Sequence, residues 1–188
     1  MKTFITGLLK GRITRWGFLA ALLIAVGASV GWMDQRHYQL GGGWIGNSND
    51  GLVWNCLQIP LDPAGKTGAI RVSAVRWSDT YAGLIAMSGA NTVSDGVGEV
   101  KMISKNTAKW TFMVYEQYAV PGASPVIKAI EVYSGTWKFT GPDTVELNYQ
   151  LDIYPPEADL HGDGFPDAGA TPFTIPGLKS TAKRVPIL

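Results

Sequence analysis

The chain has 188 residues, with 16 Lys and Arg against 15 Asp and Glu, so its formal net charge is only +1. This balance excludes a nucleic-acid-binding surface, which needs clustered positive charge. One cysteine and two histidines also exclude an internal disulfide and a closed zinc site built from Cys and His. The stability of the fold must therefore come from burial of a core.

The first segment, residues 1–40, has a basic flank and an apolar centre. An uncharged, largely apolar run of 18 residues covers positions 16–33. Four basic residues precede this run: Lys2, Lys10, Arg12 and Arg15. This pattern is typical of membrane targeting, and the excess of positive charge before the run predicts that everything after it lies outside the cytoplasm.

Two membrane-related interpretations of the segment remain open, and a buried core helix, which would normally show a polar stripe, is the less favoured third. The run is just long enough to span a bilayer as an N-terminal hydrophobic helix. The small residues in Val26-Gly27-Ala28 also suit cleavage by a signal peptidase. The sequence therefore predicts an extracytoplasmic protein, periplasmic or at the cell surface, which is either secreted after removal of a signal peptide or anchored to the inner membrane by residues 16–33.

The remaining part, residues 41–188, has the size of one domain and can bury a full core. It carries eleven Lys and Arg and fourteen Asp and Glu, a net charge of about −3. Apolar and polar residues alternate strictly over Val145–Ile153, which predicts a strand with one buried face. With the turn residues Gly141-Pro142-Asp143, the region 135–153 is predicted to be a hairpin in which Trp137 and Phe139 share a face with Val145 and Leu147, and Lys138 lies near Glu146.

Further strands are predicted from short apolar or β-branched stretches, and residues 158–177, rich in Gly, Pro and Asp, are predicted to be a long loop. The stretches are 69–77, 83–87, 97–104, 109–118, 126–134 and 180–187. Seven or eight strands with no intervening helix indicate an all-β fold, an antiparallel barrel or sandwich.

Gly42-Gly43-Trp44 forms a G-x-W motif at the start of this β-rich part. Together with the meander of strands and a late Arg184, it resembles the lipocalins and the wider calycin superfamily. The resemblance implies an up-and-down barrel of about eight strands, in which Trp44 closes the floor and Arg184, or alternatively Lys183, packs over it. The chain departs from the family by lacking a Thr-Asp-Tyr motif between middle strands and paired cysteines. The alternative is that Trp44 is a core aromatic of another β fold.

Large apolar residues on the predicted strands would line the lumen of such a barrel and bind a ligand there. The predicted ligand-binding residues are Trp77, Trp110, Phe112, Trp137, Phe139, Leu147 and Tyr149. The alternative is that these side chains pack against one another and fill the core.

The sequence contains no catalytic constellation that we recognise. A nucleophile elbow is missing, Cys56 sits among apolar neighbours, and His161 is the one conventional base after residue 40. The prediction is a non-enzymatic protein; a hydrolase or isomerase using His161 is the less favoured alternative.

Three aspartates follow the spacing of a calcium-binding loop at its positions 1, 5 and 9, with Gly164 at position 6. They are Asp159, Asp163 and Asp167. Position 12, Ala170, lacks the carboxylate, so any calcium site is expected to be weak; a solvated turn is the alternative. No other cofactor is predicted.

These features together predict an exported, calycin-like barrel that holds a small apolar or amphipathic ligand. The alternative function is a structural or accessory protein that docks on a membrane or envelope partner. The membrane would be contacted through the N-terminal helix if it is not cleaved, and no nucleic-acid partner is expected.

Overall fold

The computed structural model describes residues 40–186, and strands dominate this part of the chain. Among these residues, there are two short helices, α2 (Asp79–Ser88) and the 3-10 helix η1 (Pro156–Ala158). The strands are β1 (Gly42–Ser48), β2 (Val53–Pro60), β3 (Thr67–Arg76), β4 (Thr92–Val93), β5 (Gly96–Ser104), β6 (Thr107–Tyr118), β7 (Val126–Gly141), β8 (Thr144–Tyr154) and β9 (Phe173–Arg184).

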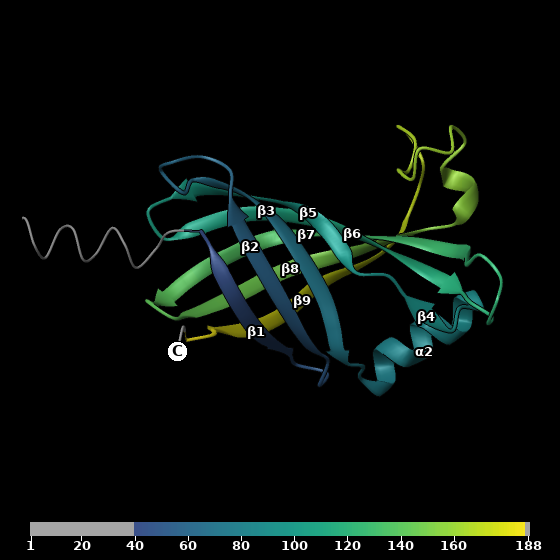
Figure 1. Ribbon diagram of the computed structural model, residues 1–188, viewed down its shortest axis with the longest axis horizontal. Coiled ribbons are helices and arrows are strands. Elements are labelled where there is room, and N and C mark those ends of the chain that lie inside the picture. The colour runs from purple at the N-terminus through teal and green to yellow at the C-terminus, as the bar shows by residue number, and fades with distance from the viewer. Residues whose placement is uncertain (1–39, 187–188) are drawn as a thin grey trace, which may run out of the picture. The chain divides into compact units, whose positions relative to one another are not determined.

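Eight of these strands close into an antiparallel barrel (Figure 1). Each pairs with its neighbour along the chain, from β1 through β2, β3, β5, β6, β7 and β8 to β9, and β9 pairs back with β1. The two-residue strand β4 adds to the end of β6 outside this ring. The predicted up-and-down, calycin-like barrel is confirmed. The hydrophobic helix predicted to precede it lies outside the described residues.

Within residues 40–186, no helix has the length and apolar character needed to cross a membrane. The segment 16–33, on which the anchor and signal predictions rest, is not part of this range.

The predicted hairpin forms between β7 and β8. Trp137 lies opposite Leu147, Phe139 opposite Val145, and the oppositely charged Lys138 and Glu146 face each other on the outer surface. The stretches 126–134 and 135–140, predicted as separate elements, form the single strand β7, which pairs along its length with both β6 and β8.

The strand predicted at 83–87 is wrong, because these residues belong to helix α2. The Ser78 side chain caps its first turn by accepting a hydrogen bond from the Tyr81 amide at 3.1 Å. Gly89, at a φ of 78°, ends the helix in the left-handed conformation that glycine adopts without strain. A short apolar run fits helix and strand equally well, so the capping residues decide this element.

The loop predicted over 158–177 is too long, because β9 begins at Phe173. Its first residues pair with the end of β8, with Ile175 opposite Leu151. The register shifts between Tyr149 and Leu151, close to Pro176 and Gly177 on β9. A β-bulge of this kind accommodates proline and glycine inside a strand, which is why composition alone indicated a loop.

One end of the barrel is closed by packed aromatic rings. Trp44 is fully buried and meets Trp137 edge to face, with ring centroids 5.2 Å apart. Phe139 packs on the same indole at 6.0 Å. The Arg184 guanidinium lies 4.4 Å from the centroid of Trp44 and donates to the Gly41 carbonyl oxygen at 2.6 Å. This is the arrangement that the calycin resemblance implies for Trp44 and Arg184; Lys183 is exposed instead.

Candidate functional site: an aromatic cavity in the barrel

Beyond the closed end, the lumen contains a cavity of about 230 Å³. Its wall comes from β2, β3, β4, β6, β7 and β8 and from helix α2, which contributes Tyr81. Eight aromatic side chains line it: Trp54, Trp77, Tyr81, Trp110, Phe112, Tyr133, Trp137 and Tyr149. The lining also includes aliphatic side chains and, at Ser94 and Asp95, a small polar portion.

The cavity is small for a ligand site. Typical sites for drug-sized ligands range from about 300 to 1,000 Å³. An engineered apolar cavity of about 150 Å³ in another protein holds benzene. The present cavity of about 230 Å³ therefore matches a compact molecule of about two fused rings.

Six of the seven predicted ligand-binding residues line this cavity: Trp77, Trp110, Phe112, Trp137, Leu147 and Tyr149. The seventh, Phe139, packs on Trp44 at the closed end instead. Sequence reasoning missed Trp54 and Tyr81. Trp54 lies in a stretch for which the sequence analysis predicts no strand, and Tyr81 lies on helix α2, where the sequence analysis predicts only a strand over 83–87.

The rings on β6 and β7 form a continuous stack along the cavity wall. Trp110 and Phe112 are parallel within 14°, with centroids 5.3 Å apart. Phe112 stacks on Tyr133 at 4.7 Å and 13°. Stacked and offset rings of this kind present flat apolar faces, which favour contact with another flat ring.

Two indole N–H groups on the cavity wall have no hydrogen-bond partner in the described part of the chain. They belong to Trp110 and Trp137, which are only 5% and 2% exposed. A buried donor without a partner costs about 1–3 kcal/mol, so an acceptor atom that enters the cavity beside either indole would be stabilised.

A buried pair of carboxyl groups accompanies the cavity, and sequence reasoning missed it. Glu131 on β7 is 0% exposed and Glu116 on β6 is 1% exposed. The hydroxyls of Tyr81 and Tyr133 both donate to Glu131 Oε2 at 2.9 Å. Glu131 also has a side-chain hydrogen bond with the Glu116 carboxyl, and neither of the two glutamates lines the cavity itself.

Burial raises the pKa of Glu131 from its ordinary value of 4.5 to about 8, and the neighbouring Glu116 carboxyl raises it further, against the two tyrosine hydrogen bonds. At neutral pH, Glu131 therefore retains a proton in most molecules. A signal for this pair was present in the sequence, because Glu116 is in step with Trp110 and Phe112 along β6, and Glu131 with Tyr133 and Trp137 along β7. Period-two alternation places such residues on the inner face.

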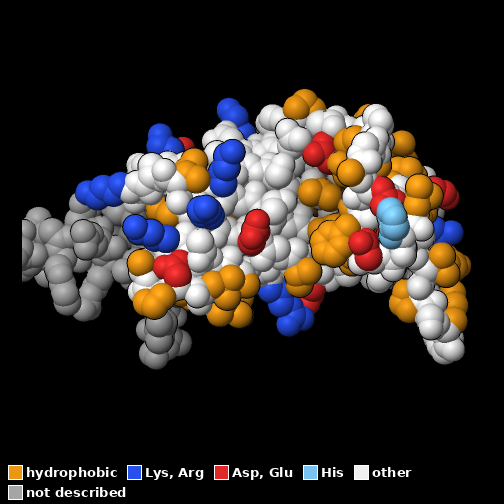
Figure 2. All heavy atoms as spheres, turned by 90° about the horizontal axis from the view of Figure 1, so that it is seen from above, with side chains coloured by type: hydrophobic (Ala, Val, Ile, Leu, Met, Phe, Trp, Pro, Cys, Tyr) orange, Lys and Arg blue, Asp and Glu red, His pale blue; other side chains and the backbone are white. Residues whose placement is uncertain are grey.

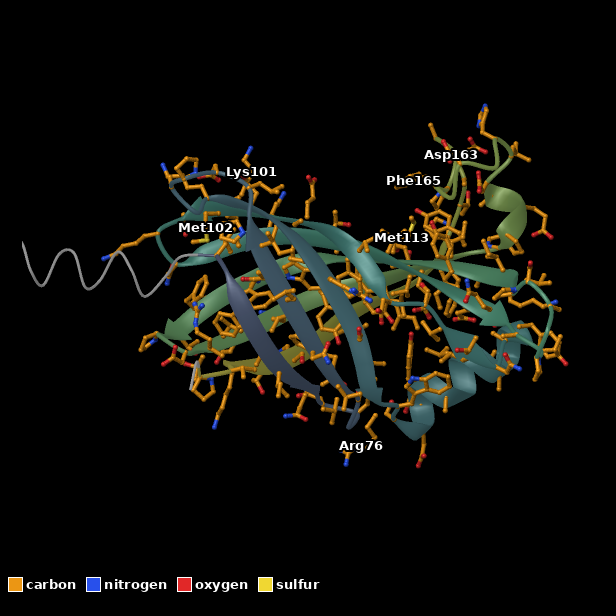
Figure 3. All side chains as sticks on the ribbon, viewed as in Figure 1. Arg76, Lys101, Met102, Met113, Asp163 and Phe165 are labelled. Atoms are coloured by element: carbon orange, nitrogen blue, oxygen red, sulfur yellow. The ribbon has the colours of Figure 1, made fainter. Side chains whose placement is uncertain are left out.

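The charge on the cavity wall is negative in sign. Among the described residues, no Lys, Arg or His lines it, and its one charged lining residue is Asp95. Asp95 is paired at the rim with Arg71, which is largely exposed. Arg76, at the end of β3, is exposed and points away from the barrel (Figure 3).

The three aspartates predicted to bind calcium lie on the loop outside the barrel, where Figure 3 shows Asp163. The Asp159 carboxylate accepts hydrogen bonds from the amides of Asp163 and Gly164, at 3.1 and 2.8 Å. Asp167 accepts from the Leu160 amide and contacts His161. Across residues 40–186, no group of three His, Cys, Asp or Glu side chains is arranged to hold a metal ion. The geometry of this loop is that of hydrogen-bonded turns.

The two residues considered for catalysis, Cys56 and His161, lie in different parts of the structure. Cys56 is buried on the cavity wall, and burial raises the pKa of its thiol to about 12. His161 lies on the outer loop, where hydrogen bonding to Asp167 raises its pKa.

No protein-family model and no curated protein sequence matches the chain. Among solved structures, it is similar to the protein EF1p2_mFAP2b, solved bound to DFHBI, at 15% identity and a TM-score of 0.41; the match covers 81% of this chain and 99% of the other. It is also similar to a redesigned beta barrel, b11L5F_LGL, at 14% identity and a TM-score of 0.40, over 81% and 96% of the two chains.

Proposed function

We propose that this protein is an exported, non-enzymatic binding protein whose barrel holds one small apolar or amphipathic ligand. The observation that carries the proposal is the cavity of about 230 Å³ with eight aromatic side chains on its wall. A single-purpose structural barrel of this size would gain stability by filling that space, because protein interiors are close-packed and cavities are costly.

The polar groups of the wall support an amphipathic rather than a purely hydrocarbon ligand. The N–H groups of Trp110 and Trp137 have no acceptor in the described part of the chain. A ligand with a flat apolar body and a small polar group would stack on the rings and satisfy some of these atoms.

A matched pair of variants on β3 tests the site. Val72 lines the cavity, whereas Val75 is 60% exposed and absent from its wall. Val72→Phe should fill the cavity, and Val75→Phe should not. Native mass spectrometry of the full-length protein, purified from its own membrane, should reveal a retained small molecule in the wild type and in Val75→Phe but not in Val72→Phe. Equal retention in both variants would place the ligand elsewhere.

Export is the part of the proposal that rests on residues 1–40. A reporter that is active only outside the cytoplasm, fused after Leu188, should be active. Replacing Leu22 and Leu23 with Lys should abolish this activity, because each charge costs roughly 2.5–3.5 kcal/mol at the centre of a membrane helix. Activity of a cytoplasm-only reporter at the same position would contradict export.

The accessory function remains the second candidate, and exposed apolar side chains favour it. Leu160, Phe165 and Phe173 are 81%, 62% and 65% exposed. Figure 2 shows hydrophobic side chains gathered at one end of the visible face and Lys and Arg gathered toward the other. Leu160→Ser with Phe165→Ser should weaken membrane or envelope association if this surface docks, and should leave cavity binding intact.

A further inference from the structure

We infer that the closed end of the barrel is a surface that binds anionic phospholipid headgroups. This contact is separate from ligand binding in the cavity and does not depend on it. Three features carry the inference: the charge of this end, its exposed aliphatic side chains and the point at which the chain enters the barrel.

Basic side chains are concentrated at the closed end. The turns at this end, with the four residues of each barrel strand nearest to it, hold seven basic residues against three acidic ones. The remainder of the described barrel domain holds four basic residues against eleven acidic ones. Figure 3 shows Lys101 at the end of the barrel opposite Asp163. A domain that is negative as a whole therefore presents one positive end. Its basic residues are Lys66, Lys101, Lys105, Lys109, Lys138, Lys183 and Arg184.

Three of these lysines surround two neighbouring hairpins. Lys66 lies in the turn between β2 and β3, and its carbonyl oxygen accepts from the Met102 amide of β5 at 2.7 Å. Lys101 lies directly opposite Lys109 across the β5–β6 ladder. All three are exposed, and none forms an ion pair within residues 40–186. Because like charges directly opposite each other are destabilising, a layer of anionic headgroups would supply the countercharge that the described chain does not.

Exposed aliphatic side chains stand among these lysines. Leu61, in the turn after β2, is 67% exposed, and Ile103, next to the turn after β5, is 53% exposed. At a bilayer surface, aliphatic side chains enter the boundary of the acyl chains while neighbouring lysines extend their ammonium groups to the headgroups. A purely electrostatic contact with an acidic protein would leave Leu61 and Ile103 in water. The combination therefore favours a lipid surface.

The chain also enters the barrel at this end. Leu40 and Gly41 directly precede β1, and the Leu40 amide donates to the Gly65 carbonyl oxygen at 3.3 Å. The apolar run predicted to be an anchor ends at residue 33, so residues 34–40 are the whole connection. Seven fully extended residues span at most about 25 Å. An anchor that is retained would keep the closed end within this distance of the bilayer.

The test compares fluorescent labels at the two ends of the full-length protein. Ile103→Cys carries the label at the closed end, and Phe165→Cys, at a similarly exposed position near the other end, is its matched control (Figure 3). Cys56 is buried and the pKa of its thiol is raised to about 12, so only the introduced cysteine should react. The labelled proteins are mixed with, or inserted into, vesicles whose lipids carry a quencher. One set contains phosphatidylcholine alone, and the other contains equal parts of phosphatidylcholine and phosphatidylglycerol.

The label at Ile103→Cys should be quenched strongly in the vesicles with phosphatidylglycerol and weakly in those without it. The label at Phe165→Cys should be quenched weakly in both. Any N-terminal anchor acts equally in the two sets, so the difference between them measures recognition of headgroup charge. Equal quenching of the Ile103→Cys label in both sets, or strong quenching at Phe165→Cys alone, would overturn the inference, and the second result would point to the surface around Leu160 and Phe165.

A pair of charge variants in the Ile103→Cys protein identifies the lysines responsible. Lys101→Gln with Lys109→Gln should lower the ratio of membrane-contacting to free barrel by about fivefold for each lysine removed. Arg76→Gln with Lys128→Gln removes the same charge far from the closed end, at the end of β3 and the start of β7, and should leave the quenching unchanged. Circular dichroism checks that both variants keep the barrel. Equal losses in the two variants, or no loss in the first, would overturn the inference.

Discussion

The two ends of the barrel lumen differ in how well their side chains are packed and in whether they bury ionisable groups. At the closed end, Trp44 is fully buried between Trp137, Phe139 and the Arg184 guanidinium, so size and shape are matched. Toward α2, the lumen keeps a cavity and buries two carboxyl groups without a counterion among the described residues. The first arrangement stabilises a barrel, whereas the second is costly to fold and is retained where a site needs it.

The largest expected difference between the two ends is in how much an alanine substitution there lowers the free energy of unfolding. Trp44→Ala should lower the free energy of unfolding by about 3–5 kcal/mol, as truncation of a buried aromatic does. Trp77→Ala, at the cavity and 37% exposed, should cost clearly less, because its ring already contacts water. Urea denaturation of both variants measures the difference. Equal losses would show that the closed end is no better packed than the cavity.

A double-mutant cycle tests whether the contact between Trp44 and Arg184 stabilises the closed end. Because Arg184 packs over Trp44, Arg184→Ala should cost less in the Trp44→Ala background than in the wild type. Strict additivity would mean that the two side chains do not stabilise each other, despite their separation of 4.4 Å.

The closed end and most of the aromatic cavity wall could be predicted from the sequence, whereas helix α2 and the buried carboxyl pair could not. Strict alternation in β8 and the G-x-W motif place the buried aromatics, because period-two patterns fix which face of a strand is inside. Helix α2 escaped prediction because its short apolar run has no helical period long enough to read, and its cap depends on a single serine.

The sequence analysis did not predict the buried carboxyl pair for a different reason. Charged residues on strands are ordinarily solvated, so Glu116 and Glu131 read as outer positions unless the inward parity of each strand is followed to its end. The two residues also meet diagonally across the β6–β7 ladder, with Glu131 opposite Val114 and Glu116 opposite Ala129, and no local pattern reveals this register.

The next prediction concerns the pH dependence of stability. Glu131 has a pKa of about 8 in the folded protein and 4.5 ordinarily, so between these values the folded state binds more protons than the unfolded state. Stability contributed by this group is therefore full below about pH 4.5 and declines as pH rises to 8, by on the order of 5 kcal/mol in total.

Thermal melts at several pH values, compared between wild type and Glu131→Gln, isolate this contribution. The difference in melting temperature should shift in favour of Glu131→Gln as pH increases, because glutamine cannot ionise. Parallel curves from pH 5 to pH 9 would show that the carboxyl pair carries no such cost, and would remove the energetic distinction between the two ends.

The smallest expected effect lies at helix α2, which carries Tyr81 to Glu131. The Ser78 hydroxyl accepts from the Tyr81 amide and also donates to Asp50 Oδ2 at 2.5 Å, which ties the helix to the turn after β1. Ser78→Ala should cost about 1 kcal/mol, as loss of an N-cap does. Ser88→Ala, which removes only a hydroxyl bonded to the Ile85 carbonyl at the other end of the helix, should cost less. Hydrogen exchange should quicken in α2 of Ser78→Ala while the amides around Trp44 keep their protection, because local opening need not reach the packed closed end. Uniform acceleration over the whole barrel would instead show that both ends unfold as one unit.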